Sequence, residues 1–296
     1  SFGSRVDING SNLVVAKASG YRKVYHYNVS ETNGSITANG LISPDSESNN
    51  AANEFGFSLA IDGNLLAVGA KDAYESGVPQ VGAVYLFELN SSNSTQVARI
   101  TASDGTSSDQ FGYDVEVSGN LIVAGAGYDD PLSKSNAGSA YVFKRESNGS
   151  ITELAKLLHE DPQSSDYFGW QVAISGNMVA VGAERDDVIF SGSNKGDAGS
   201  VTLFKLDGNG TATRTMTLTA PTPYNSCYFG CAVAMSGDML AVGEYRRNTT
   251  NSYSGRVYLY KINPNGTAQL TTTIDSPNPI NYGYFGVSVD LSGDRL

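Results

Sequence analysis

The chain is poor in the residues on which most catalytic and metal-binding sites depend. Its 296 residues include two histidines, two cysteines and one tryptophan, and charged residues make up only 17%. There is no Gly-x-Ser-x-Gly elbow, no His-Glu-x-x-His segment and no phosphate-binding glycine loop. We therefore expect a non-enzymatic protein with no catalytic residue, no metal ligand and no cofactor.

The chain also lacks long apolar runs and any excess of positive charge. No hydrophobic stretch approaches the roughly 20 residues that span a bilayer as a helix, so we expect no membrane insertion. The net charge of −11 and the isoelectric point near 4.6 argue against nucleic acids and anionic membranes as partners. The chain starts without methionine or a signal-like segment, which indicates a mature product or a fragment.

What the chain has instead is an internal repeat. The segment NEFGFSLAIDGNLLAVGA at 53–70 returns as DQFGYDVEVSGNLIVAGA at 109–126 and as DYFGWQVAISGNMVAVGA at 166–183. Related segments occur at 227–244, in weaker form at 1–18 and in truncated form at 283–296. The Phe-Gly pair recurs every 53–61 residues, a period typical of an array or a propeller. The pairs begin at Phe2, Phe55, Phe111, Phe168, Phe229 and Phe285.

Each unit is expected to contain four short antiparallel strands. The first follows Phe-Gly, and a turn such as Ser-Gly-Asn joins it to a second strand that ends in Val-Gly-Ala. A loop of about ten residues precedes the third strand, and a short turn precedes the fourth. Strands that are apolar at nearly every position need cover on both faces, as propeller blades provide; a solenoid fits such units less well. The glycines are expected where backbones approach closely.

The predicted fold is therefore an all-β propeller that forms a single domain over 1–296. We expect five complete four-stranded repeats and the start of a sixth. The repeats run over 1–53, 54–109, 110–166, 167–227 and 228–283, and the partial one over 284–296.

The Phe-Gly…Val-Gly-Ala units resemble the FG-GAP repeat, the blade unit of integrin alpha-chain propellers and of many secreted proteins. The resemblance covers essentially the whole chain and implies seven blades in the intact protein. Blades of the integrin type often carry an Asp-x-Asp-x-Asp-Gly calcium loop between their first two strands. Here that place holds only short turns such as Asp62–Asn64 and Ser118–Asn120, which cannot supply six oxygens. The chain resembles the short variety without the calcium loop.

The two cysteines leave two alternatives open. Residues four apart on an extended strand lie roughly 13 Å apart, whereas a disulfide needs Cα atoms within about 7 Å. A disulfide between Cys227 and Cys231 would therefore require the chain to fold back, and two separately buried thiols are the other interpretation.

The histidines and the acidic loop residues favour structural roles. His26 takes a position that other repeats fill with Leu or Val, which predicts a packed strand residue, and His159 has no counterpart in the other repeats. Asp72, Asp129–Asp130 and Asp186–Asp187 follow second strands. They could line a cation site, but turn capping by aspartate is the simpler interpretation.

Nine Asn-x-Ser/Thr sequons distinguish the chain from a plain repeat protein. Most fall in the turns between third and fourth strands, where Asn-Gly is a favoured hairpin dipeptide. That preference does not explain the Ser or Thr that follows, so we predict N-glycans on this end of the sheets. The sequons are at Asn9, Asn28, Asn33, Asn90, Asn93, Asn148, Asn209, Asn248 and Asn265.

The function expected from these features is that of an extracellular or cell-surface glycoprotein in adhesion, or of a structural subunit of a surface or filamentous assembly. Its partners would be other proteins or further copies of itself, bound by the long-loop face or by blade edges. The alternative is a carbohydrate-binding lectin that uses tyrosines such as Tyr128 and Tyr245, although most aromatic residues next to Phe-Gly have packing as their simpler role.

Overall fold

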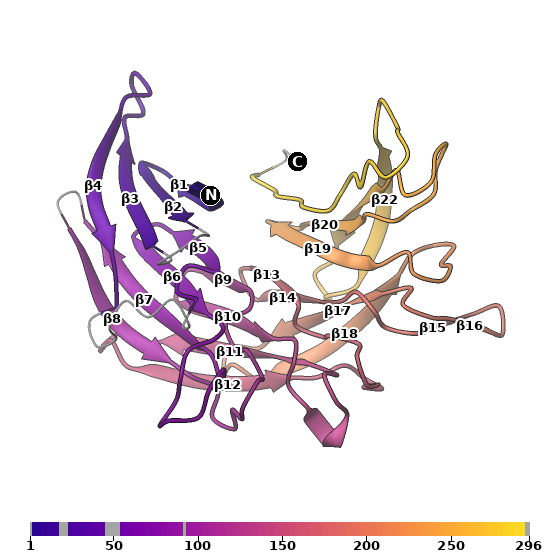
Figure 1. Cartoon of the computed structure of the whole chain (residues 1–296), viewed down its shortest axis with the longest axis horizontal. Helices are drawn as coiled ribbons and strands as arrows, with labels where there is room; N and C mark the ends of the chain where they lie inside the picture. Colours follow the sequence, from indigo (N-terminus) through magenta and orange to yellow (C-terminus); the bar gives the residue numbers. More distant parts are fainter. Residues whose placement is uncertain (1, 18–22, 45–53, 91–92, 294–296) are drawn as a thin grey trace. The chain divides into compact units, whose positions relative to one another are not determined.

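The computed structural model describes residues 2–17, 23–44, 54–90 and 93–293. Over these residues the chain is built from β-strands, apart from turns, loops and the single-turn 3-10 helix η2 (Pro131–Ser133) (Figure 1). Internal contacts divide it into two compact units, one of residues 1–129 with 141–153 and one of residues 130–140 with 154–296. Each unit is described by itself.

Within the described residues, five antiparallel sheets each have four strands in chain order, as the repeat predicts. The first sheet contains β1 (Phe2–Asn9), β2 (Asn12–Lys17), β3 (Lys23–Val29) and β4 (Ile36–Ile42). The second contains β5 (Ser58–Asp62), β6 (Leu65–Ala70), β7 (Ala83–Leu89) and β8 (Ser94–Ile100). The third contains β9 (Val115–Ser118), β10 (Leu121–Ala126), β11 (Ser139–Arg145) and β12 (Ile151–Leu157).

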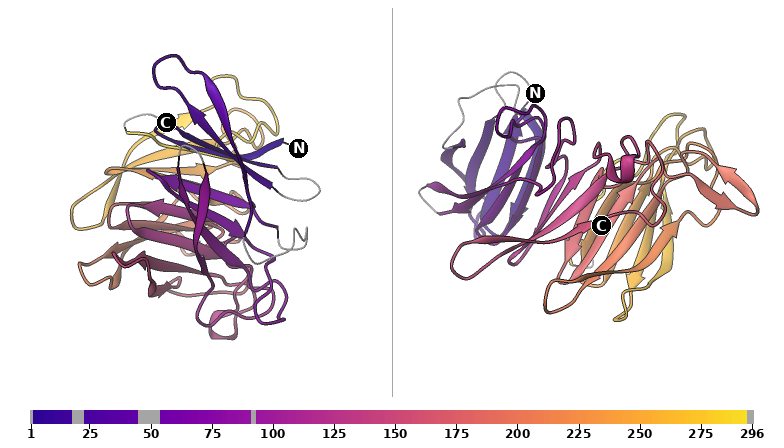
Figure 2. Two further views of the ribbon diagram at one scale, coloured as in Figure 1. Left: turned by 90° about the vertical axis from the view of Figure 1, so that its left-hand side faces the viewer. Right: turned by 90° about the horizontal axis from the view of Figure 1, so that it is seen from below.

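The remaining strands belong to the second unit. The fourth sheet contains β13 (Gln171–Ser175), β14 (Met178–Ala183), β17 (Ser200–Leu206) and β18 (Ala212–Thr219). The fifth contains β19 (Phe229–Ser236), β20 (Met239–Glu244), β21 (Arg256–Ile262) and β22 (Ala268–Asp275). A two-stranded hairpin, β15 (Val188–Phe190) with β16 (Ser193–Lys195), extends from the fourth sheet (Figures 1 and 2).

The strand pairings follow from local turn chemistry. Asp62 pairs with Leu65 across a two-residue turn that contains Gly63 at a φ of 58°. Tight hairpins of this kind need a positive φ, which glycine adopts at little cost. Since strand direction alternates, the connections from first to second and from third to fourth strand leave one end of a sheet. We call this the turn end; the opposite loop end carries Phe-Gly, Val-Gly-Ala and the long connection from second to third strand.

Apolar layers lie between neighbouring sheets of the same unit. In the first unit one layer combines buried residues of the first and second sheets, such as Val14 and Leu66, and another combines the second and third, such as Leu86 and Ile122. In the second unit Leu203 and Val242 belong to a layer shared by the fourth and fifth sheets. This explains why inner strands are apolar on both faces.

The recurring glycines hold successive repeats at backbone distance, which confirms the sequence-based expectation. A Cβ on Gly69 of Val-Gly-Ala would lie 2.2 Å from the carbonyl oxygen of Gly112, the glycine of the next Phe-Gly pair. A Cβ on Gly82 would lie 2.0 Å from the carbonyl oxygen of Phe111, with which Gly82 forms a parallel bridge. No side chain fits at either distance, so glycine is required at Gly69 and Gly82 where the backbone of the next repeat approaches.

The beginning of the sixth repeat docks as the complete ones do. Phe285 bridges Gly255 of the fifth sheet, as Phe111 bridges Gly82. Described residues 276–293 form no strand longer than an isolated bridge. The blade count of seven and the repeat boundaries stay predictions.

Candidate functional site

Five tyrosines and one arginine gather at the loop end of the fifth sheet. The guanidinium carbon of Arg246 lies 4.6 Å from the ring centroid of Tyr228, 5.4 Å from that of Tyr245 and 5.7 Å from that of Tyr253. Further ring contacts at 5.4–6.2 Å link Tyr245, Tyr253, Tyr282 and Tyr284. We call this set the tyrosine–arginine cluster: Tyr228, Tyr245, Arg246, Tyr253, Tyr282 and Tyr284.

The cluster runs from a buried base to an exposed edge. Tyr228 is buried, whereas Tyr282 is 60% exposed. The Nε of Arg246 is buried without a hydrogen-bond partner, so the guanidinium is held mainly by aromatic faces.

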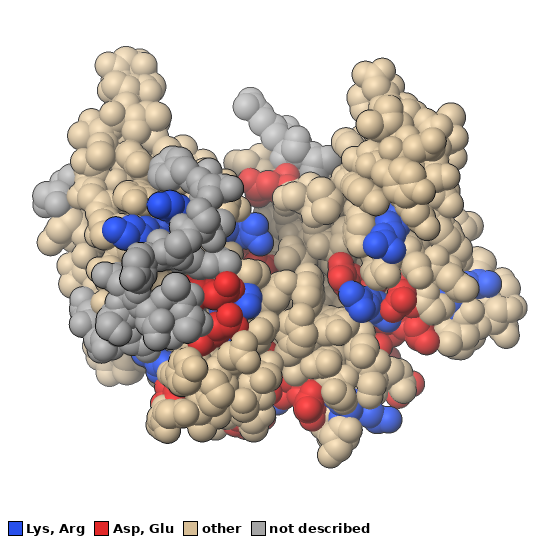
Figure 3. All heavy atoms as spheres, viewed as in Figure 1, with Lys and Arg blue, Asp and Glu red and all other residues tan. Residues whose placement is uncertain are grey.

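Figure 3 shows acidic and basic side chains next to each other on the face in view, so the net negative charge forms no patch of one sign there.

Smaller stacks of the same kind recur at the loop ends of other sheets. In the fourth sheet Arg185 lies over Tyr167, whose ring contacts Trp170. In the first unit Lys71 lies over Phe57, whose ring centroid is 4.8 Å from that of Tyr113. The aromatic residues beside Phe-Gly therefore pack as expected, but mostly on each other and on cations at the loop end.

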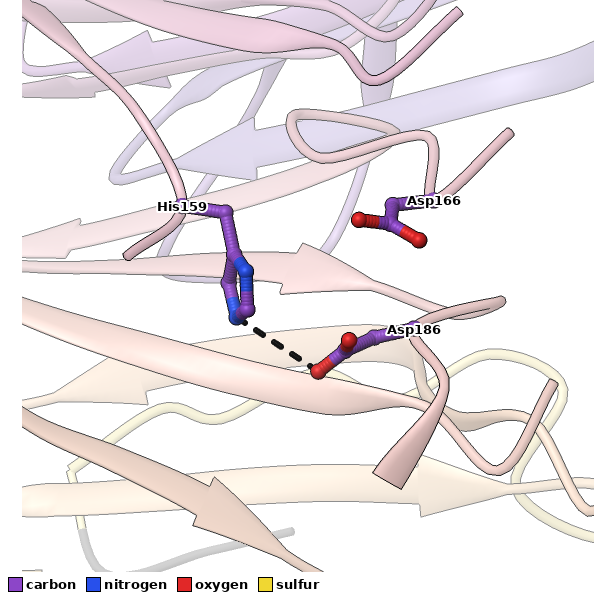
Figure 4. Close-up of side chains that lie close together, drawn as sticks. All are labelled: His159, Asp166 and Asp186. Atoms are coloured by element: carbon purple, nitrogen blue, oxygen red, sulfur yellow. Dashed lines mark ion pairs between the residues drawn. The ribbon is translucent and has the colours of Figure 1, made fainter. Parts of the chain in front are cut away.

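A second feature, in the second unit, brings one imidazole and two carboxylates together. His159 lies two residues after β12, Asp166 lies two residues before Phe168, and Asp186 lies three residues after β14. One ligand-type atom from each lies within 4.8 Å of the others. The imidazole Nε2 is 3.4 Å from Oδ2 of Asp186, and Asp166 directs a carboxylate oxygen toward the same ring (Figure 4). We call these three residues the His159 cluster.

The His159 cluster is closed to solvent, and this changes its electrostatics. The side chains of His159 and Asp186 are only 8% and 9% exposed. Burial raises the pKa of Asp166 to about 7, and the neighbouring Asp186 carboxylate adds to the rise. Burial likewise raises the pKa of Asp186, although the His159 side chain and the Ser200 hydroxyl beside it favour the ionised form.

The corresponding place in the third sheet is built differently. There the hydroxyl of Tyr141 donates to Asp104 at 2.7 Å and lies 3.3 Å from the buried Asp129. Asp129 and Asp186 hold equivalent positions, three residues after a second strand. In the fourth sheet the residue equivalent to Tyr141 is the shorter Thr202. The imidazole of His159 lies beside Asp186 in place of a tyrosine hydroxyl.

The second aspartate of each pair caps a turn, the role favoured from the sequence. Oδ1 of Asp187 accepts from the backbone N–H of Asp197 at 2.9 Å, and Oδ1 of Asp130 accepts from that of Asn136 at 2.6 Å. The first aspartate of each pair, in contrast, faces inward. The sequence-based interpretation treated both members of a pair alike and thus missed the His159 cluster.

The other histidine is structural, as predicted. His26 in β3 is 1% exposed, and its Nε2 lies 2.9 Å from Oδ1 of Asn12. Burial lowers the pKa of His26, which favours the neutral ring.

Both cysteines are buried free thiols with separate partners. The Sγ of Cys227 lies 3.3 Å from the carbonyl oxygen of Ala198, and the Sγ of Cys231 lies 3.6 Å from that of Gly286. Burial raises the pKa of Cys227 to about 12, and it raises the pKa of Cys231 as well.

The asparagines of the turn-end sequons are exposed, and the turns use their side chains. Oδ1 of Asn148 accepts from the backbone N–H and the hydroxyl of Ser150, and Asn265 does the same with Thr267. These bonds give the Ser or Thr of the sequon a role in the turn itself. Asn9 and Asn28 are half-buried, and Asn248 is exposed at the loop end. Exposed sequon residues at the turn end are Asn33, Asn90, Asn93, Asn148, Asn209 and Asn265.

Comparison with known proteins identifies the protein family to which these four-stranded sheets and glycine contacts belong. The family model of the FG-GAP repeat matches residues 41–87, 94–143, 151–204 and 213–260. The chain therefore belongs to the FG-GAP repeat family. Each of the four matched segments begins in the fourth strand of one sheet and ends in the third strand of the next.

Individual relatives are more distant. The chain is similar to integrin alpha-6 of Gallus gallus, with 28% identity over 164 residues, which covers 48% of this chain and 14% of the integrin. A solved structure of a protein from Lactobacillus plantarum has a TM-score of 0.50 at 14% identity and covers 85% of this chain and 62% of that one. The chain thus spans less than two thirds of each relative, and the second likeness concerns the fold alone. In the described part of the chain, no helix has the length and hydropathy needed to cross a bilayer.

Proposed function

We propose that this chain is a non-enzymatic, extracellular interaction module for adhesion or surface assembly, which binds a protein partner through the tyrosine–arginine cluster. The observation that carries the proposal is Arg246 stacked among tyrosines whose outer member, Tyr282, is 60% exposed. Tyrosine and arginine are among the residues most enriched at energetic centres of protein interfaces. The similarity to an integrin alpha chain supports an adhesive role at the cell surface.

The placement of the cluster supports the same role. It lies at the loop end, whereas six exposed sequon asparagines lie at the turn ends of the sheets. Glycans at the turn ends would leave the loop ends as the protein surface accessible to a partner or to a further copy of the chain.

The alternative function is sugar binding, because exposed tyrosine rings also stack on carbohydrates. The guanidinium of Arg246 lies over Tyr228 and Tyr245, so one face of each ring is already covered. Only Tyr282, the most exposed member, still offers a ring to a sugar. Because the rings of Tyr228 and Tyr245 are already covered by Arg246, the cluster favours a protein partner.

The test is chemical cross-linking of the tag-free chain to intact surfaces of its source cells, followed by mass spectrometry. We expect cross-links to a protein partner to map to the loop end, and Arg246→Ala and Tyr282→Ala to weaken binding at least tenfold. Arg214→Ala is the matched control, since Arg214 pairs with Glu160 away from the cluster.

Two results would contradict the proposal. Saturable binding on a glycan array that Tyr282→Ala abolishes would favour the lectin alternative. Cross-links confined to the turn end, unaffected by both cluster variants, would place the interface elsewhere.

A further inference from the structure

We propose that His159, Asp166 and Asp186 form a binding site for one divalent transition-metal cation of the zinc type. The site lies within the second unit and is separate from the tyrosine–arginine cluster. It joins three segments: the end of β12, the approach to β13 and the long connection between β14 and β17 (Figure 4).

The orientation of the imidazole is the first argument. Nδ1 of His159 lies 3.2 Å from the carbonyl oxygen of Asp161, and because a carbonyl only accepts, Nδ1 carries the proton. In the neutral ring the lone pair is then on Nε2, which points into the cluster. This Nε2 makes no hydrogen bond, and its acidic neighbour is Oδ2 of Asp186 at 3.4 Å, the contact drawn as an ion pair in Figure 4. The side chain that carries it is more than nine-tenths buried. A backbone carbonyl on one ring nitrogen is the usual orienting contact of a metal-binding histidine.

The charge of the cluster is the second argument. Two carboxylates and a lone pair converge in a space closed to solvent, where like charges repel strongly. A cation would neutralise both carboxylates and occupy the lone pair at once.

The distances suit a small ion. Zinc lies about 2.0–2.2 Å from nitrogen and oxygen ligands, which puts the ligand atoms of a tetrahedral site about 3.4 Å apart. Nε2 of His159 and Oδ2 of Asp186 are already 3.4 Å apart, and the whole set lies within 4.8 Å. Asp166 would have to move its side chain closer to act as the third ligand, and a water molecule would take the fourth position of the tetrahedron.

The sequence differences between repeats point to the same place. Alignment of the repeats in the sequence puts His159 where other repeats have the small residues Ala102 and Ala220. It puts Thr202 where others have Tyr85, Tyr141 and Tyr258. Beside Asp186 the tyrosine of one repeat is thus lost, and an imidazole from the end of the preceding repeat takes its place. The approach to the Phe-Gly pair differs as well. Asp109 accepts from both the N–H and the hydroxyl of Thr106, whereas Asp166 accepts only the N–H of Gln163.

The ligand types select among metals. Calcium and magnesium prefer oxygen ligands alone, whereas one imidazole with two carboxylates suits zinc, cobalt or manganese. Bound metal would fix the β14–β17 connection, which carries the β15–β16 hairpin, to the two segments before it. We therefore expect a structural role.

The test is zinc binding by the tag-free chain after treatment with EDTA, measured by competition with a chromophoric zinc indicator. We expect one zinc per chain, and cobalt substitution should give the intense visible absorption of a tetrahedral site. Asp186→Asn should weaken zinc binding at least tenfold. Asp129→Asn is the matched control at the equivalent position of the third sheet, and it should bind zinc as the wild type does.

A repacked variant keeps the test decisive if single substitutions misfold. His159→Ala combined with Thr202→Tyr reproduces the arrangement of the third sheet, so it should fold without metal and lose stoichiometric zinc binding. The proposal is overturned if the wild type binds no zinc at micromolar concentration, if the repacked variant binds it equally well, or if calcium competes at equal concentration.

Discussion

At the scale of single residues, burial decides which polar groups of this chain can react. Cys227 is fully buried, and its pKa of about 12 leaves only a minute thiolate fraction near neutral pH. Cys231 is also buried, and burial raises its pKa too. The two thiols thus behave as small packed side chains rather than as a redox pair.

We therefore predict that the native protein resists thiol reagents. Without reductant, Ellman's reagent at pH 8 should react at least a hundredfold more slowly with the folded chain than with the chain unfolded in guanidinium, which should release two equivalents. Reaction of fewer than two thiols after unfolding would reveal a disulfide between Cys227 and Cys231.

An exposed pair near the loop end gives a pH-dependent prediction. The guanidinium of Arg256 donates two hydrogen bonds to Asp275, and these bonds lower the pKa of Asp275 below its ordinary value of 3.8. A lowered folded-state pKa contributes stability above pH 3.8 that is lost as the pH falls through the folded-state value. Arg256→Gln should cost less than about 1 kcal/mol at pH 7, because the pair is partly exposed.

Urea unfolding curves at pH 7 and pH 2.5 check this prediction. The difference between wild type and Arg256→Gln should shrink at the lower pH, since protonation of Asp275 removes the charge with which Arg256 pairs. A difference that stays constant or grows with acidity would contradict it.

At the scale of elements, the contact between one repeat and the next depends on glycine. Gly82 has a φ of 89°, and an added Cβ would meet both the nitrogen and the carbonyl oxygen of Phe111 within 2.4 Å. Since these are backbone atoms of the next repeat, they cannot move aside without breaking the bridge between Gly82 and Phe111. The motif is therefore a packing device shared between repeats.

We predict that Gly82→Ala lowers the free energy of unfolding by about 3 kcal/mol or more. Gly63→Ala is the control, because Gly63 also has a positive φ but has no atom within 4 Å of its added Cβ. Its cost should be only about 1 kcal/mol of backbone strain. Equal losses for the two variants in urea unfolding would show that close approach is not what selects glycine at Gly82.

The same elements show what the sequence could and could not predict. Hairpins such as β5–β6 depend on residues only a few positions apart. The sequence Asp62-Gly63-Asn64 between two apolar alternations was therefore sufficient to predict this hairpin. The His159 cluster joins residues up to 27 positions apart on three connections, and its geometry depends on the register of a whole sheet. The signal was present in the alignment of repeats, where Thr202 replaces a tyrosine and His159 replaces an alanine. The tyrosine–arginine cluster likewise depends on a contact between distant parts of the sequence. The sixth Phe-Gly pair docks on the fifth sheet, and this brings Tyr284 against Tyr245 and Tyr282 against Tyr284.

At the scale of the whole molecule, the repeat places different kinds of side chain at the two ends of its sheets. Aromatic and cationic stacks recur at loop ends, and six sequon asparagines lie exposed at turn ends. Hairpin chemistry accounts for the asparagines and also for Ser150 and Thr267, whose hydroxyls donate to them. It does not account for Asn90 and Asn93, which form their turn without glycine.

We predict N-glycans at the turn ends in protein from its native source. Occupied sites should include Asn33, Asn90 or Asn93, Asn148, Asn209 and Asn265, since all are exposed. Half-buried Asn9, whose Oδ1 accepts from the N–H of Gly63, should be occupied less. Glycopeptide mass spectrometry, with oxygen-18 labelling during enzymatic deglycosylation, measures each site. Unmodified asparagine at most turn-end sites would contradict the prediction and leave turn chemistry as the explanation of the sequons. Occupancy there would restrict protein contacts to the loop ends and sheet edges, because glycans cover the surface around their attachment points.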